Sequence, residues 1–214
     1  MTGGVTRFLL MRHAETAVPH VFHGAESDIG LSERGELQVQ ALAPIMAAER
    51  PAAVVSSAMR RAIATAKPIA DACGLTLHIE TRLHERRVGL MSGRPFDDSR
   101  WPETMNQWIA GNTSFAVDGA ESYDDIRDRV LPIWHRLAEQ YAGRCVIIVA
   151  HGTVNKVLLT SLGAGLTHAD WNAFKSLNLG VHELLHDGKH WRILRLADVP
   201  PEVQAIAVTG GLKN

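Results

Sequence analysis

Short apolar runs alternate with amphipathic helical segments along most of the chain, and this alternation constrains the fold more than any other feature of the sequence. The runs have the length of single buried strands, and the segments between them repeat apolar residues at helical spacing. We expect strands at Arg7–Met11, Ala52–Ser56, Leu75–Ile79 and Val146–Ala150, and helices at residues 32–50, Arg60–Cys73, Glu121–Tyr141 and Gly152–Leu162. This order is typical of α/β proteins. We therefore predict a three-layer sandwich with a mostly parallel central sheet and helices on both of its faces.

The last third of the chain adds a hairpin. The apolar stretches Leu179–Leu185 and Trp191–Leu196 flank Asp187-Gly188, a dipeptide that favours a tight hairpin turn. A hairpin at the end of a parallel sheet predicts an antiparallel edge strand. Such an edge could pair with a second copy of the chain, which predicts a homodimer, or be capped by the tail Ala205–Asn214.

Particular residues shape the helices within this pattern. Ser32 is a good N-cap for the first helix. Three helical segments contain a proline, at Pro44, Pro68 and Pro132, and proline removes a backbone hydrogen bond from a helix. We expect kinks at these positions, and at Pro132 either a kink or a division of the helix.

The chain is long enough for one large domain or two small ones, since it has 214 residues. Regular patterning is lost from Thr81 to Gly119, where Gly, Pro, Trp and Arg collect. We interpret residues 86–120 as an insertion of loops and a short helix that forms a lid. The prediction is a single domain over residues 1–214.

Composition excludes several classes of protein. The formal net charge is −1, with 22 Lys and Arg against 23 Asp and Glu, so we expect no nucleic-acid binding. The apolar runs are far shorter than the ~20 residues of a membrane span, and residues 1–11 lack the pattern of a signal peptide. The two cysteines, Cys73 and Cys145, are too few for a disulfide scaffold and are expected to be buried thiols. We therefore expect a soluble, cytoplasmic protein without a membrane partner.

Polar residues follow the predicted strands at the points where the strands end. Arg12 and His13 follow the first strand, Arg61 stands shortly after the second, Glu85 lies just past the third, and His151 follows the fourth. Ligands of such sheets bind outside the carboxyl ends of the strands. The sequence therefore predicts that these side chains converge on one site.

These residue types suit phosphoryl transfer. Arginine presents a rigid fork of donors that matches a tetrahedral oxyanion, and neutral histidine is an effective covalent nucleophile. Backbone N–H groups at the start of the Gly152 helix could bind an anion, and a nearby carboxylic acid could protonate the leaving oxygen. The prediction is a phosphoryl-transfer site that uses a histidine nucleophile and needs no metal and no cofactor.

Six motifs in this order resemble the histidine phosphatase superfamily, which includes phosphoglycerate mutases and many phosphomonoesterases. They are L-M-R-H-A-E-T at Leu10–Thr16, G-L-S-E-R-G at Gly30–Gly35, S-S-A-M-R-R-A at Ser56–Ala62, L-H-E-R-R-V-G at Leu83–Gly89 with S-G-R after it, G-A-E-S at Gly119–Ser122 and V-A-H-G-T at Val149–Thr153. The resemblance implies that His13 becomes a phosphohistidine and that Glu85 is the proton donor. It also implies that Arg12, Arg61 and His151 cradle the phosphoryl group.

Further residues in or near these motifs are candidates for contact with a small phosphorylated substrate. They are Thr16, His23, Gly24, Arg86, Glu121, Ser122, Gly152 and Thr153. Some of them have a second interpretation, since Glu121-Ser122 could simply cap the long helix that follows. Trp101 and Trp108, seven residues apart, could line a substrate lid or pin the insertion to the body.

The proton donor and a metal site each allow a second interpretation. Glu15, Glu103 or Glu121 could replace Glu85 as the proton donor. His20 and His23 stand three residues apart, but without a carboxylate or cysteine partner they are better interpreted as loop histidines than as metal ligands.

The chain departs from the pattern of the superfamily at several positions. Ala14 replaces the usual glycine after the nucleophile, and Pro19 stands where an asparagine usually contacts phosphate, so that contact is lost unless His20 or His23 replaces it. Arg86 and Arg87 follow Glu85 where acidic or neutral residues are usual, and a nearby cation would make Glu85 a poorer acid unless it points away.

The favoured function is a metal-independent phosphomonoesterase that acts on a small phosphorylated metabolite. A phosphoglycerate mutase is the first alternative, because Arg86, Arg87, Arg94 and Arg100 could hold a second phosphate. The short segment between Leu90 and Gly119 argues against a mutase lid. A catalytically impaired protein that binds a phosphorylated ligand is a third possibility, and a metal-dependent hydrolase is the weakest.

Overall fold

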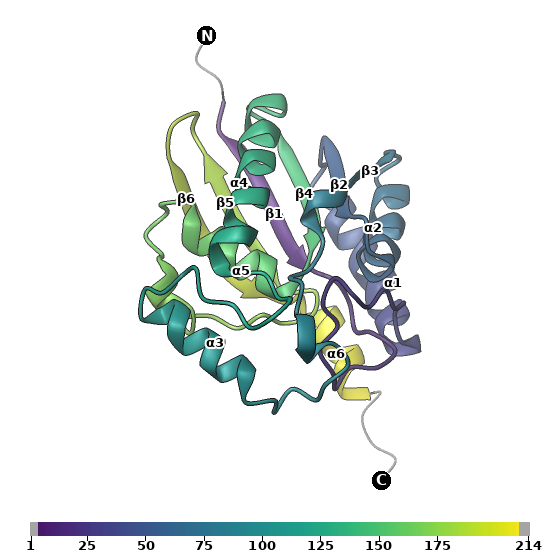
Figure 1. The fold of residues 1–214 in the computed structure, drawn as a ribbon. Helices are drawn as coiled ribbons and strands as arrows, with labels where there is room; N and C mark the ends of the chain where they lie inside the picture. Colours follow the sequence, from purple (N-terminus) through teal and green to yellow (C-terminus); the bar gives the residue numbers. More distant parts are fainter. Residues whose placement is uncertain (1–3, 210–214) are drawn as a thin grey trace.

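A six-stranded mixed sheet forms the middle layer of the computed structural model, which describes residues 4–209 (Figure 1). The strands are β1 (Thr6–Arg12), β2 (Ala53–Ser57), β3 (Leu77–Glu80), β4 (Cys145–Ala150), β5 (Val181–His186) and β6 (Trp191–Asp198), in the order β3-β2-β4-β1-β5-β6. The first four strands run parallel, whereas β5 is antiparallel to β1 and to β6. The α/β class and the mostly parallel sheet are thus confirmed. The strand that runs against the others is β5, one position inside the edge strand β6.

Helices cover both faces of this sheet. They are α1 (Glu33–Ala48), α2 (Arg60–Ala72), α3 (Arg100–Ile109), α4 (Tyr123–Gln140), α5 (Gly152–Ser161) and α6 (Pro201–Thr209), with short 3₁₀ turns at Thr81–Leu83, Gly89–Met91 and His168–Asp170. In β1, Phe8 and Leu10 pack with α4 and α5, while Leu9 and Met11 pack with α1 and α2. Because successive strand residues point to opposite faces, this alternation buries β1 on both sides, and the predicted three layers are confirmed.

Local sequence explains why α1 begins where it does. The Ser32 hydroxyl accepts a hydrogen bond from the Gly35 amide at 3.0 Å, and Glu33 and Glu36 lie in the first turn. The carboxylates interact favourably with the positive end of the helix dipole. The predicted N-cap is confirmed.

Tertiary packing decides the outcome at Pro132. The helix α4 continues through this residue, so the predicted division of the helix is wrong. Proline inside a helix costs roughly 3 kcal/mol. Ile126, Val130 and Trp134 are fully buried on the sheet side of α4. Burial of each large apolar side chain contributes about 1.5–3 kcal/mol, which outweighs the cost of the proline.

The C-terminal helix α6 was not expected from the sequence. It packs against α1, and Val203 joins the core shared by α1 and α2. The described part of the predicted Ala205–Asn214 tail therefore covers a helix and not the sheet edge; residues 210–214 lie outside the described residues. The homodimer stays a prediction.

The sheet direction positions the functional site. The carboxyl ends of β1, β2 and β4 lie at one edge, and β5 begins there because it runs the opposite way. The segment before β5 is thereby brought to the same edge. Residues 86–120 contain one 3₁₀ turn and α3, and Figure 1 shows α3 below the sheet at this end of the molecule. The single domain with a lid stays a prediction.

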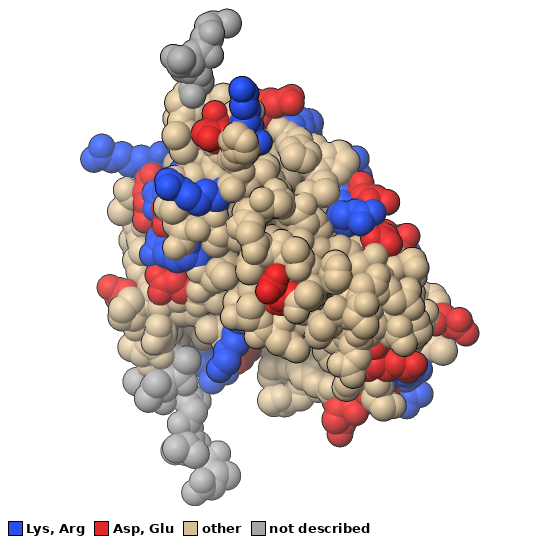
Figure 2. All heavy atoms as spheres, turned by 90° about the vertical axis from the view of Figure 1, so that its left-hand side faces the viewer, with Lys and Arg blue, Asp and Glu red and all other residues tan. Residues whose placement is uncertain are grey.

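Charge is mixed on the face drawn in Figure 2. Blue and red side chains lie interspersed toward its margins, and uncharged side chains fill most of its middle. This face therefore carries no broad patch of one sign, and the expectation that the chain does not bind nucleic acid stays a prediction. Among residues 4–209, no helix is long and apolar enough to cross a membrane.

Candidate active site

A cavity of about 520 Å³ opens at the carboxyl ends of the parallel strands. Its lining comes from the segment after β1, the segment around α3, the first turns of α5 and the segment before β5. The lining residues are Arg12, His13, Thr16, Pro19, Val21, Phe22, His23, Gly24, Glu85, Val88, Phe96, Trp101, Met105, Gly152, Thr153, Lys156, Trp171, Asn172, Ser176 and Asn178. Eight of the thirteen predicted site residues are in this lining, namely Arg12, His13, Thr16, His23, Gly24, Glu85, Gly152 and Thr153.

His13 lies directly after β1 and is only 4% exposed. Its Nδ1 donates a hydrogen bond to the Ala14 carbonyl oxygen at 2.7 Å. A carbonyl oxygen only accepts, so the proton sits on Nδ1 and the lone pair of Nε2 is free. Burial, with the charges of Arg12 and Arg61, holds the pKa of His13 well below its ordinary value. The imidazole is therefore neutral near neutral pH, the form that can act as a nucleophile.

Arg12 lies on the cavity wall beside His13, and one end of its guanidinium is anchored. Its Nη1 donates to the Ser176 carbonyl oxygen at 2.7 Å, and its buried Nε has no partner within the described residues. A fixed guanidinium with a free donor can bind an oxyanion without first being ordered.

Arg61 lies behind the cavity wall. It is fully buried in α2 and is not part of the lining. Its guanidinium donates to the carbonyl oxygens of His23 and Ser27, both at 2.8 Å. Arg61 therefore holds the loop that carries His23 and Gly24 in place. Its positive charge also lowers the pKa of His13.

His151 also lies behind the wall, with its ring centroid 5.3 Å from that of His13. Its Nε2 shares a hydrogen bond with the Ser57 hydroxyl at 2.8 Å, and its buried Nδ1 has no partner among the described residues. Burial, together with the charge of Arg61, holds the pKa of His151 well below its ordinary value. The structure thus brings two neutral histidines together.

Glu85 is the one carboxylate in the described lining of the cavity. It accepts hydrogen bonds from the amides of Arg86 at 2.8 Å, Thr153 at 3.3 Å and Val154 at 3.4 Å. The N-terminus of α5, which we expected to be free for an anion, therefore directs two amides at Glu85. Amides of its own loop and of α5 thus hold this carboxylate in the cavity wall.

The alternative proton donors are held elsewhere. Glu15 pairs with Arg34 and accepts from the Ser32 hydroxyl at 2.8 Å, and Glu103 is exposed on α3. Neither is in the cavity lining. Within residues 4–209, no three His, Cys, Asp or Glu side chains are grouped as metal ligands.

Gly24 lines the cavity at a point where a side chain would not fit. A Cβ atom there would lie 2.5 Å from a Val88 methyl group and 2.8 Å from the Arg86 carbonyl oxygen. The backbone around Gly24 can approach the Arg86–Val88 segment only because this residue is glycine. The close approach brings His23 and Glu85 to the same cavity.

Arg86 does not reach the cavity, although the sequence predicted a contact with substrate. It is fully buried, with its Nε 2.8 Å from the Glu121 carbonyl oxygen. Its guanidinium lies 5.3 Å from the Trp101 ring centroid and 4.9 Å from that of Trp108. Burial lowers the pKa of Arg86 to about 10. Trp101 lines the cavity and Trp108 is wholly buried, so both interpretations of this tryptophan pair apply, one to each residue.

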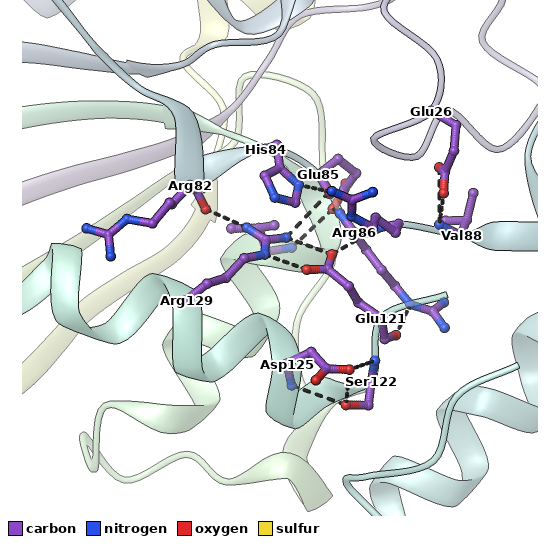
Figure 3. A network of polar contacts seen from close by, with 12 residues as sticks. Glu26, Arg82, His84, Glu85, Arg86, Val88, Glu121, Ser122, Asp125 and Arg129 are labelled. Carbon is purple, nitrogen blue, oxygen red and sulfur yellow. Dashed lines mark hydrogen bonds and ion pairs between the residues drawn. The ribbon is translucent and has the colours of Figure 1, made fainter. Parts of the chain in front are cut away.

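Glu121 and Ser122 also make structural contacts outside the cavity, as Figure 3 shows. Ser122 caps α4 in a capping box with Asp125, which is the second interpretation of this dipeptide. Glu121 pairs with Arg129 at 2.7 Å and accepts from the Arg87 amide at 2.9 Å. Arg129 in turn donates to the Glu85 carbonyl oxygen at 3.4 Å, which ties this pair to the segment that carries Glu85.

We expect Glu121→Gln to destabilise the fold in a pH-dependent way. Burial raises the pKa of Glu121, but Arg129 and the Arg87 amide outweigh it and hold the pKa below its ordinary value of 4.5. A carboxyl whose pKa is lowered by folding stabilises the protein fully at a pH above its unfolded pKa. This stabilisation is lost as the pH falls through the folded pKa. The substitution should lower the free energy of unfolding by about 1–3 kcal/mol at neutral pH. The difference should shrink below pH 4.5.

Urea unfolding of both proteins over this pH range measures the effect. Asp71→Asn is the matched control, because the Lys67 and Asp71 side chains of this ion pair are each 58% exposed. Such a pair should contribute under about 0.5 kcal/mol to the free energy of unfolding. A loss in Glu121→Gln no larger than in this control would contradict the role assigned to the buried pair.

Sequence reasoning missed the cavity residues of the segment before β5. Trp171, Asn172, Ser176 and Asn178 all line the cavity, and Asn178 Nδ2 donates to the His13 carbonyl oxygen at 2.8 Å. The signal was available in the predicted hairpin, since an antiparallel strand begins where parallel strands end.

A neutral histidine beside an arginine at the carboxyl edge of an α/β sheet is suited to the transfer of phosphoryl groups. Comparison with known proteins narrows this chemistry to one family. Residues 8–199 match the histidine phosphatase superfamily, branch 1, and the chain belongs to that superfamily. With phosphatases among its relatives, it is a phosphoric monoester hydrolase.

Two curated relatives and one solved structure illustrate the similarity. A glucosyl-3-phosphoglycerate phosphatase of Mycolicibacterium vanbaalenii is 32% identical over 177 residues, which cover 78% of each chain. A metal-independent phosphoserine phosphatase of Arabidopsis thaliana is 33% identical over 91% of this chain and 82% of its own. The native structure of a mycobacterial glucosyl-3-phosphoglycerate phosphatase superposes with a TM-score of 0.80 at 27% identity, covering 92% of this chain and 100% of that one.

Probable phosphoglycerate mutases are also among the relatives. In three longer mycobacterial relatives, the region that matches this chain makes up 46% of the protein.

Proposed function

We propose that the protein hydrolyses phosphomonoesters of small metabolites through a phosphohistidine on His13. The observation that carries the proposal is the fixed, neutral imidazole of His13, with its Nδ1 bound to the Ala14 carbonyl oxygen and Arg12 beside it in the cavity. The relatives named as phosphatases of glucosyl-3-phosphoglycerate and of phosphoserine support a small phosphorylated metabolite as the substrate.

The reaction would proceed in two balanced steps. In the first, Nε2 of His13 attacks phosphorus, the P–N bond forms, and the bond to the leaving oxygen breaks. Glu85 in its protonated form gives its proton to that oxygen, and the alcohol leaves. In the second, the Glu85 carboxylate takes a proton from water as the water attacks phosphorus. The P–N bond breaks, inorganic phosphate leaves, and both side chains return to their starting states.

Stabilisation of charge on the phosphoryl oxygens is assigned to the cationic end of the cavity. Arg12 would bind these oxygens directly, since it lines the cavity and its guanidinium is already anchored by the Ser176 carbonyl oxygen. Arg61 and His151 would act from behind the wall, Arg61 through its charge and the loop that it shapes. Thr16, His23, Gly24, Gly152 and Thr153 line the walls that meet the substrate. Arg86 and Glu121 position the Glu85 segment, and Ser122 caps α4.

The lining favours a hydrolase over a mutase. A mutase must hold a second phosphate, and four arginines after Glu85 were the candidates for that task. None of the four is in the cavity lining: Arg86 is buried under tryptophans, Arg87 and Arg94 are exposed, and Arg100 pairs with Asp98. Lys156 is the only lysine or arginine besides Arg12 in the described lining.

An assay that follows both products tests the proposal. The protein is incubated with 3-phosphoglycerate or p-nitrophenyl phosphate in the presence of a chelator. We expect free phosphate to appear in proportion to the ester consumed. Formation of 2-phosphoglycerate without free phosphate would establish the mutase instead. Binding without turnover, and without a labelled phosphoenzyme, would leave the impaired phospho-ligand-binding protein.

The cytoplasm is the compartment that we propose. Cys73 and Cys145 are both free thiols, which suits a reducing environment. Burial also raises the pKa of Cys145 to about 11, so its reactive thiolate form is suppressed.

A further inference from the structure

Large apolar side chains form much of the wall of the cavity. Phe22, Phe96, Trp101, Met105 and Trp171 all line it, joined by Val21 and Val88. Phe22 packs edge-on against Phe96, with centroids 5.0 Å apart, and against Trp101 at 5.7 Å. Phe96 is 49% exposed, so the cavity lining includes an apolar ring that is accessible to solvent. Such a wall favours a flat, apolar ligand group.

One cation interrupts this wall. Lys156 lies on α5 one helical turn beyond Gly152 and Thr153, hence about 5 Å along the helix from these two lining residues. Its Nζ donates to the Trp171 carbonyl oxygen at 2.6 Å and lies 5.2 Å from the ring centroids of Trp171 and Phe174. These contacts hold the ammonium group at one place in the cavity wall.

The charge of Lys156 is not neutralised by the protein. Among the ion pairs of residues 4–209, none includes Lys156. Burial lowers its pKa, with no carboxylate to offset the effect. A partly buried cation without a counter-ion gains most from a ligand that brings one.

We propose that the leaving group of the substrate carries an aromatic ring, which packs on this wall, and an anionic group, which pairs with Lys156. The inference rests on the proposed function and names the substrate class of the same site. A three-carbon acid would leave most of a cavity of about 520 Å³ unfilled. A sugar ring can stack on aromatic side chains, but its hydroxyl groups need polar partners, which Phe22 and Phe96 do not supply.

Four phosphate esters of unactivated alcohols test the proposal on the intact protein. 4-Carboxybenzyl phosphate has the ring and the charge, and 4-carbamoylbenzyl phosphate has the same ring without the charge. 3-Phosphoglycerate has the charge without the ring, and glucose 6-phosphate has a ring covered with hydroxyl groups. We expect kcat/KM for 4-carboxybenzyl phosphate to exceed that for each of the others by about tenfold or more.

Two variants assign the preference to the residues. Lys156→Met should raise KM for the carboxybenzyl ester by about tenfold more than for the carbamoylbenzyl ester. Phe96→Ala should raise KM for both benzyl esters by about three- to tenfold relative to 3-phosphoglycerate. Lys175→Met and Leu90→Ala are the matched controls, since both residues are exposed and outside the lining, and they should leave all four values unchanged.

The outcomes separate this inference from the proposed function. Faster turnover of 3-phosphoglycerate or glucose 6-phosphate than of the carboxybenzyl ester would overturn the inference and leave the hydrolase intact. Equal losses for both benzyl esters in Lys156→Met would do the same. If no phosphate were released from any of the four esters, the proposed function would fail and the inference with it.

Discussion

His13→Ala is expected to reduce phosphate release by roughly 10⁴- to 10⁶-fold, the range seen when a covalent nucleophile is removed. The reason is that His23, the other histidine in the described lining, has both ring nitrogens engaged, by the Ser27 hydroxyl and the Val18 carbonyl oxygen. His151 cannot substitute, because its Nε2 is engaged by Ser57 and it lies behind the wall. Stopped assays with p-nitrophenyl phosphate, and labelling of the protein with ³²P-phosphate ester followed by acid and alkali treatment, measure the effect. Label on the wild type should be lost in acid and retained in alkali, as expected for a phosphorus–nitrogen bond.

A surface histidine provides the control for this substitution. His78 is exposed on β3 and outside the cavity, so His78→Ala should retain full activity and labelling. His13 is itself buried, and thermal unfolding of the variant should therefore be recorded beside the assay. A folded His13→Ala protein that still releases phosphate or still takes up label would contradict the assignment of the nucleophile.

Glu85→Gln is expected to lower kcat/KM by about 10²- to 10⁴-fold for esters of ordinary alcohols. The loss should be much smaller for p-nitrophenyl phosphate. An alkoxide is a poor leaving group and needs the proton that Glu85 supplies, whereas p-nitrophenolate leaves without one. Since kcat/KM reports on the first step alone, the later role of Glu85 in activating water does not obscure the comparison. Steady-state rates with 4-carbamoylbenzyl phosphate and p-nitrophenyl phosphate provide the measurement.

Two checks protect this interpretation. Glu103→Gln alters an exposed carboxylate on α3 and should change neither rate. The glutamine at position 85 has one oxygen where the carboxylate has two to accept from Arg86, Thr153 and Val154, so its unfolding temperature should also be compared. An equal loss for both esters would argue that Glu85 orients the site and does not protonate the leaving oxygen.

Much of the fold could be predicted because its causes are local. The apolar runs and helical spacings of β1, β2, β4, α1, α2 and α5 depend on neighbouring residues, and the structure has all six elements. Ser32 caps α1 through a contact three residues away. By contrast, α4 passes through Pro132 because Trp134 and its neighbours pack against the sheet, and that packing is not visible in the local sequence.

The candidate site also contains residues that the sequence predicted and residues that it did not. Arg12, His13, Glu85 and the His151 ring meet because parallel strands bring their carboxyl ends together, a rule that operates on strand order alone. Lys156 and the segment before β5 were missed, because their arrival in the cavity depends on the reversed direction of β5 and on the face that α5 turns to the cavity.

The sequence by itself thus determined the layers, the edge of the sheet that carries the chemistry and the residues at the strand ends. Only the tertiary structure decided which of the nearby charged residues face the cavity. Arg86 and Glu121 stand in promising motifs, yet one is buried against Trp101 and Trp108 and the other pairs with Arg129. The physical reason is that the direction of a charged side chain depends on partners far away in the chain, whereas the periodicity of a helix or strand depends on its neighbours.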